Sequence, residues 1–109
     1  MLDILFGSKN KERVLVFLEG REEGYARQIA NYYNCELSPL QNQLSKLELS
    51  GVLVSKMLGR TRMYYFNKSC PYLTELKMLL KKAIVFLPEE EASRLLLNRR
   101  RPRRKGKPL

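Results

Sequence analysis

The polar face of one expected helix holds the side chains best suited to chemistry in this sequence. Its members recur at helical spacing: Ser38, Gln41, Asn42, Ser45 and Lys46. Gln and Asn each carry an amide that donates and accepts hydrogen bonds, which matches the edge of an adenine base. Lys46 lies about one turn further along the helix and suits a phosphate group. On an isolated helix such a face is more often simply solvated, so the surrounding elements must decide between the two interpretations.

No pattern in the sequence favours catalysis or a metal site. The chain has 109 residues, no His and two Cys. Without His there is no His-based general base and no His-ligated metal, and two Cys are too few for a four-thiolate zinc site. The consecutive acids Glu89 to Glu91 point in different directions on a helix and suit its first turn. We therefore expect no enzyme, no cofactor and no metal. Cys35 and Cys70 are expected to be free thiols, with a redox switch between them as the lesser alternative.

The positive charge of the chain is concentrated at its C-terminal end. The formal net charge is +10, and seven Lys and Arg residues lie within 98–109 without an acid. Residues 1–97 keep 14 Lys and Arg against 11 acids. This excess indicates a polyanionic partner. The segment 98–109 is almost free of apolar residues, so we expect a disordered basic tail that follows a domain of residues 1–97.

The N-terminus and the apolar runs indicate where the protein is found. The first residues lack the basic region of a signal peptide, and the longest apolar runs are much shorter than a membrane span requires. We expect a cytoplasmic, nucleoid-associated protein that has no membrane partner.

The hydrophobic periodicity predicts a definite order of elements. An apolar N-terminal segment, residues 2–6, is expected to dock on the core or on a second subunit. Helices are expected over about 9–19, 25–32, 37–50, 72–86 and 89–97. Gly20 is expected to end the first of these helices, and Pro39 is tolerated only in the first turn of the third. Strands over 52–55 and 61–66, with a turn at Gly59, form a β-hairpin.

This order of elements predicts an α+β, mainly α fold: a winged helix-turn-helix with a β-hairpin wing and C-terminal helices. In that arrangement the polar face of helix 37–50 reaches base edges in the major groove of DNA. The basic wing residues Lys56, Arg60 and Arg62 approach the backbone or the neighbouring minor groove. Arg27 faces away from the apolar stripe of the preceding short helix and joins the predicted DNA-binding set.

Several stretches of sequence also carry a family resemblance. They are LFGSK at 5–9, YARQIA at 25–30, LSKLELSGVL at 44–53, GRTRMYYFN at 59–67 and PYLTEL at 71–76. Together they resemble the winged helix-turn-helix transcriptional regulators, in particular the arsenical-resistance-repressor-like branch. The resemblance implies a homodimer that binds an operator, with the interface formed by the N-terminal segment and helix 72–86. Metal-sensing members place paired Cys on the recognition helix, or His and acid pairs on the last helix, and this chain has neither.

The basic tail allows two interpretations. Arg101, Arg103 and Arg104, which flank Pro102, suit insertion into a narrow minor groove. The favoured interpretation is a non-specific electrostatic anchor. For the whole chain, the leading hypothesis is a sequence-specific regulator that binds double-stranded DNA. The alternatives are a winged-helix protein-interaction or architectural module with non-specific nucleic-acid binding through the tail, and an RNA-binding protein.

Overall fold

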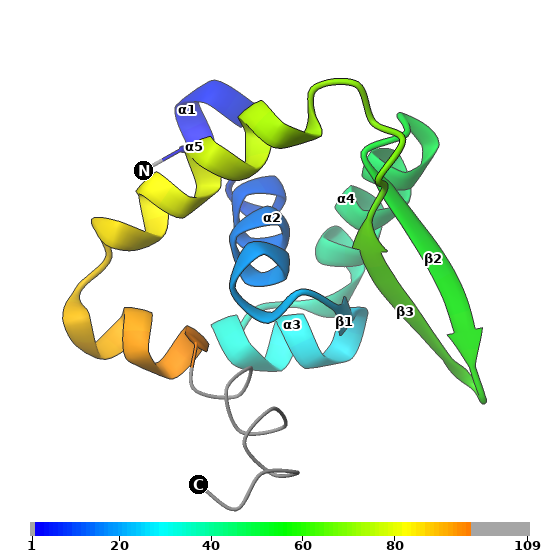
Figure 1. Cartoon of the computed structure of the whole chain (residues 1–109). Coiled ribbons are helices and arrows are strands. Elements are labelled where there is room, and N and C mark those ends of the chain that lie inside the picture. Colours follow the sequence, from blue (N-terminus) through cyan, green and yellow to red (C-terminus); the bar gives the residue numbers. More distant parts are fainter. Residues whose placement is uncertain (1, 97–109) are drawn as a thin grey trace, which may run out of the picture.

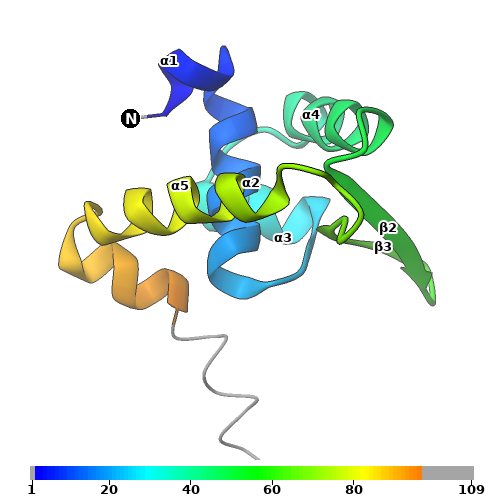
Figure 2. The ribbon, with the colours of Figure 1, turned by 45° about the horizontal axis from the view of Figure 1, so that its top comes forward.

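A computed structural model describes residues 2–96 of the chain, and the central helix α2 (Lys9–Arg21) organises them. The side chain of Ser8 caps α2 by accepting a hydrogen bond from the backbone N–H of Lys11. Residues 14–20 of α2 are all buried. A helix without an exposed stripe needs neighbours on several sides. These neighbours are α1 (Asp3–Phe6), α3 (Ala26–Tyr33), α4 (Leu37–Leu49) and α5 (Leu73–Val85), which surround α2 in Figures 1 and 2.

The helices α3 and α4 form the predicted helix-turn-helix unit. Ile29 and Ala30 bury the inner side of α3, and the turn that follows reverses at Asn34 in the left-handed conformation. In α4 the side chains of Leu40, Leu44 and Leu47 are buried, as their spacing predicted. The observed start at Leu37 and end at Leu49 lie within about one residue of the predicted bounds. The predicted winged helix-turn-helix fold is therefore confirmed in its central unit.

The sheet has three antiparallel strands in the order β1 (Gly24–Tyr25), β3 (Thr61–Phe66), β2 (Leu53–Leu58). The hairpin β2–β3 is the predicted wing, although β2 extends three residues beyond the predicted end. The strand β1 was not predicted from the sequence, because two residues are too few to show a periodicity. Its position depends on Gly24, since a Cβ atom there would lie 2.7 Å from the Phe17 ring. That close approach lets β1 pair with β3 and connects the wing to the start of α3.

Gly20 has a different role from the predicted one. The helix α2 continues to Arg21, and the residue that caps it in the left-handed conformation is Glu22. Gly20 is needed because a further helix, residues 89–96, packs against it. A Cβ atom on Gly20 would lie 2.6 Å from Cγ of the buried Leu95. The predicted last helix is thus present over the described residues and docks on α2.

One buried ion pair connects the central helix to α5. The carboxylate of Glu19 is only 4% exposed and accepts a 2.8 Å hydrogen bond from Nζ of Lys77. The same Nζ lies 4.7 Å from the centre of the Phe66 ring. A buried carboxylate is tolerated when a cation compensates it. Lys77 therefore joins α2, α5 and β3.

We predict that Gly20→Ala lowers the free energy of unfolding by about 1–3 kcal/mol, because the added methyl group overlaps Leu95. This loss is expected although Ala is the better helix former by about 1 kcal/mol. Urea denaturation followed by circular dichroism measures the change. Leu95→Ala is the matched variant, and its cost together with Gly20→Ala should be smaller than the sum of the two single losses. Additive losses would show that the two residues do not compete for the same space.

Candidate nucleic-acid interface

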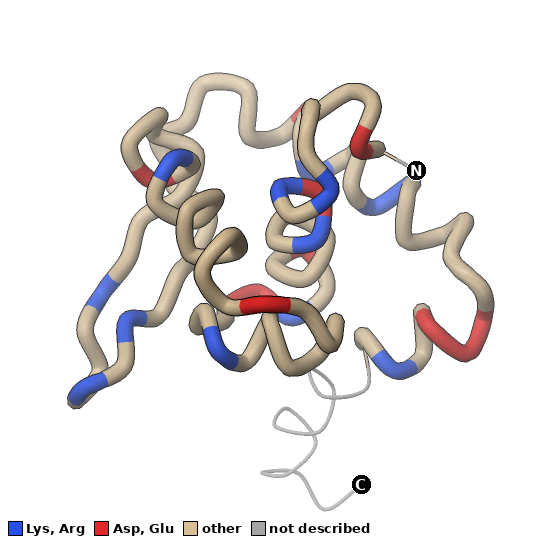
Figure 3. The backbone as a smooth tube through the Cα atoms, turned by 180° about the vertical axis from the view of Figure 1, so that it is seen from behind, with Lys and Arg blue, Asp and Glu red and all other residues tan. Residues whose placement is uncertain are grey.

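A groove of about 700 Å³ separates the exposed face of α4 from the wing and the start of α3. It is lined by Tyr25, Ala26, Arg27, Ser38, Gln41, Asn42, Ser45, Arg60, Thr61, Arg62 and Tyr64. Arginine is present on both sides of the groove and no acid is among the lining residues, so its potential is positive. Figure 3 shows the Lys and Arg positions along the wing beside α4. We call this feature the α4–wing groove.

The packing of α4 explains why its polar side chains face the groove. Leu40, Leu44 and Leu47 are buried against the core, which turns the opposite face of the helix to solvent. Ser38, Gln41, Asn42 and Ser45 are all exposed on that face. Their amide and hydroxyl groups are therefore available to a partner that enters the groove.

Most of the residues predicted to contact DNA line the α4–wing groove, and two of the described ones do not. Lys46 is exposed but lies outside the lining residues. Lys56 pairs with Met63 across the hairpin, so its side chain projects from the opposite face of the wing to Arg62. Its Nζ lies 5.9 Å from the centre of the Tyr65 ring. The predicted tail residues Arg101, Arg103 and Arg104 lie outside the described residues.

A chain of hydrogen bonds that the sequence did not predict orients the wing against α4. Nη1 of Arg62 donates to Oγ of Ser55 at 2.8 Å, and that hydroxyl donates to Oε2 of Glu48 at 2.7 Å. Ser55 and Arg62 share one face of the hairpin because the register places them diagonally opposite each other. The chain fixes the guanidinium of Arg62 at the edge of the groove. Only the strand register could have indicated this link, since the sequence separation of the residues carries no signal.

Tyr64, on β3, is one of the residues that line the groove. Its side chain is largely buried, and this burial raises the pKa of its phenol above the ordinary value. The charge of Glu48 raises the pKa further, and Arg62 opposes the shift. The phenol is therefore neutral at physiological pH and able to donate a hydrogen bond towards the groove.

The described residues also bear on metal binding, on the cysteine thiols and on membrane insertion. No group of three or more His, Cys, Asp or Glu residues in this part of the chain is arranged to hold a metal ion. Cys35 and Cys70 are free thiols, half-buried and buried respectively. Among the described helices, none has the length and apolar content needed to cross a membrane.

Comparisons with known proteins identify the fold. No family model and no curated protein matches the sequence. Solved structures do match. The YusO protein from Bacillus subtilis is 17% identical, with a TM-score of 0.56 over 94% of this chain and 76% of that chain. A MarR-family transcriptional regulator from Silicibacter pomeroyi is 15% identical, with a TM-score of 0.59 over 99% of this chain and 79% of that chain.

A third solved structure extends the set to another organism. The transcriptional regulator BldR from Sulfolobus solfataricus is 15% identical, with a TM-score of 0.53 over 98% of this chain and 68% of that chain. At such identities the similarity establishes the fold, and it does not single out the predicted arsenical-resistance-repressor-like branch. The chain has the winged helix-turn-helix fold, which it shares with solved transcriptional regulators, one of them described as a member of the MarR family.

Proposed function

We propose that this chain is a transcriptional regulator that binds double-stranded DNA in a sequence-specific manner, as a homodimer and without catalysis. The observation that carries the proposal is the α4–wing groove, where exposed amide and hydroxyl groups of α4 lie between arginines of α3 and of the wing. The solved structures with the same fold that are described as transcriptional regulators support this function. Nucleoid association in the cytoplasm follows from the proposed DNA binding.

The geometry suits a duplex whose major groove receives α4. A major groove about 12 Å wide admits one helix, and the exposed amides of Gln41 and Asn42 then face the base edges. Arg27, at the start of α3, and Arg62, on the wing, lie on either side and suit the phosphates that border the groove. Base contacts by the amides select the sequence, while phosphate contacts by the arginines fix the register of the protein on DNA.

An apolar surface on α1 and α5 supports the proposed homodimer. Ile4 and Leu5 on α1 are exposed, as are Met78 and Val85 on α5 and Phe86 at its end. Both helices pack on α2, away from the α4–wing groove. A second copy that covers this surface leaves both grooves open. A two-fold axis then presents the two α4 helices to half-sites about 34 Å apart.

We predict that Asn42→Ala weakens binding to the preferred duplex by about 1–3 kcal/mol and leaves binding to random duplex unchanged, because the lost contact is to a base edge. Selection of bound duplexes from a random library identifies the preferred site, and fluorescence anisotropy on both duplexes gives the affinities. Lys56→Ala is the control, since Lys56 projects away from the groove and should not change the sequence preference.

The same selection separates the proposed function from an interaction module. A recovered motif whose preference is lost in Asn42→Ala supports sequence-specific binding. Recovery of no motif would overturn it and favour an architectural or protein-interaction role. An equal loss by Asn42→Ala on both duplexes would show that Asn42 contacts the backbone rather than a base.

We predict that Phe86→Asp converts the dimer to a monomer, because a carboxylate within an apolar interface loses its hydration. Light scattering coupled to size-exclusion chromatography measures the mass of the particle. Leu49→Asp is the matched control, since Leu49 is 90% exposed and lies on α4, away from the proposed interface. A wild-type monomer, or a Phe86→Asp dimer, would contradict this interface.

A further inference from the structure

The end of the described chain is held against α3 by two arginines that share one aromatic ring. The guanidinium of Arg94, on helix 89–96, lies 4.1 Å from the centre of the Tyr32 ring, and that of Arg21 lies 5.1 Å from it. Nη2 of Arg94 also donates to the carbonyl oxygen of Tyr32 at 2.8 Å. We call these three residues the Tyr32 clamp.

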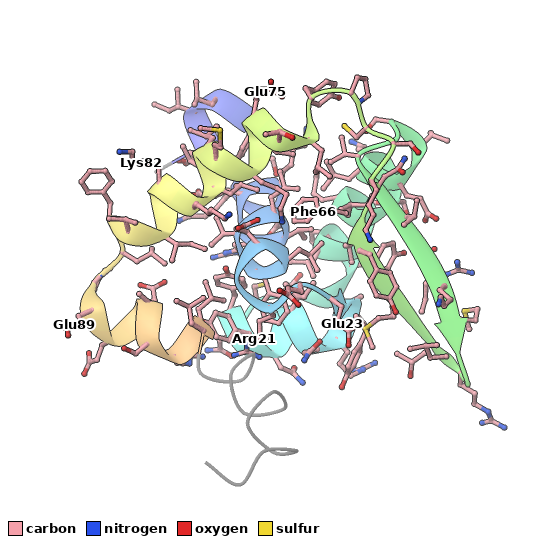
Figure 4. All side chains as sticks on the ribbon, viewed as in Figure 1. Arg21, Glu23, Phe66, Glu75, Lys82 and Glu89 are labelled. Carbon is pink, nitrogen blue, oxygen red and sulfur yellow. The ribbon has the colours of Figure 1, made fainter. Side chains whose placement is uncertain are left out.

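Arg21 adds hydrogen bonds that connect α2 to the end of the same helix. Its Nε donates to the carbonyl oxygen of Leu95 at 2.8 Å, and its Nη2 donates to that of Arg94 at 3.2 Å. A guanidinium carries several N–H donors in a fixed geometry, so it is well suited to two neighbouring carbonyl groups. Figure 4 labels Arg21 at the end of α2 that lies near helix 89–96. The clamp thus fixes the point at which the chain continues beyond residue 96.

The helix α3 connects this point to the α4–wing groove. Arg27 lines the groove near the start of α3, and Tyr32 follows it by five residues, or roughly 7.5 Å along the helix axis. Figure 1 shows helix 89–96 beside the opposite end of α3 from the wing. The residues that follow in sequence, 98–109, contain seven Lys and Arg and no acid. An extended chain reaches about 3.3 Å per residue, so phosphates that flank the groove lie within its range.

We propose that Tyr32, with Arg21 and Arg94, is a positioning residue that delivers the basic segment 98–109 to the DNA backbone beside α3. This inference rests on the proposed DNA binding and adds how segment 98–109 is brought to the DNA backbone. The clamp keeps small the number of residues between the folded domain and the basic segment, and a short connection gives this segment a high effective concentration at nearby phosphates. Release of helix 89–96 lengthens the connection by about ten residues. The expected loss of affinity is about threefold to tenfold.

Four full-length proteins test the proposal: wild type, Tyr32→Leu, a variant with the seven Lys and Arg of 98–109 replaced by Gln, and the combination of both changes. Their affinities for a labelled duplex of random sequence are measured by fluorescence anisotropy, over a salt range low enough for every protein to bind. Tyr32→Leu should weaken binding and reduce the salt slope when the basic segment is intact. It should leave both quantities unchanged when that segment is neutral. An equal loss in both backgrounds, or no loss in either, would overturn the proposal.

Further measurements separate positioning from a loss of folding. Hydrogen exchange of the backbone amides of 89–96 should accelerate in Tyr32→Leu while the amides of α4 stay protected, and unchanged exchange of 89–96 would refute the clamp. Arg94→Met removes an exposed cation without changing the core, and it should reproduce the background-dependent loss. Tyr72→Leu, at an exposed tyrosine before α5, should alter neither binding nor exchange. Because the duplex has random sequence, this test is independent of whether a preferred site is found.

Discussion

The burial of residues 14–20 of α2 is the constraint on which the other elements depend. None of these residues is exposed, so each side of the helix must be covered by another segment. The neighbours α1, α3, α4 and α5 provide this cover, and helix 89–96 closes the side at Gly20. Burial would also leave the Glu19 carboxylate without water, and Lys77 of α5 compensates it. The elements around α2 are thereby held in one arrangement.

This constraint builds the α4–wing groove indirectly. Leu40, Leu44 and Leu47 of α4 turn inward to cover the core and leave the polar residues of the same helix on the surface. Gly24 brings β1 close to Phe17, and the pairing of β1 with β3 then holds the wing beside the start of α3. The chain of hydrogen bonds from Arg62 to Glu48 sets the wing against α4. The groove is therefore a consequence of core packing together with a few polar contacts.

Features that repeat along the chain could be predicted from the sequence, and features that depend on a single contact could not. The three-and-four spacing of the α4 leucines predicted both the helix and its exposed polar face. In contrast, a glycine after an apolar run is typical of a helix end, which is why Gly20 was predicted to end a helix. Its actual contact is with Leu95, a residue 75 positions later. The two residues of β1 are too few to show a period. Lys56 and Arg62 look alike as basic wing residues, and the strand register alone places them on opposite faces.

The distribution of charge divides the proposed tasks between two parts of the chain. Residues 1–97 hold nearly balanced charges, whereas 98–109 carries most of the net excess. Attraction to phosphates depends on the number of cations and is independent of sequence, while discrimination between bases requires fixed donors and acceptors. The amides on α4 are held rigidly and suit the second task. In the proposed complex α3 joins the two parts, because it borders the groove near Arg27 and holds the root of the basic segment at Tyr32. Because α3 is a rigid helix, the non-specific attraction of the basic segment to phosphates acts close to the α4–wing groove, where the bases are selected.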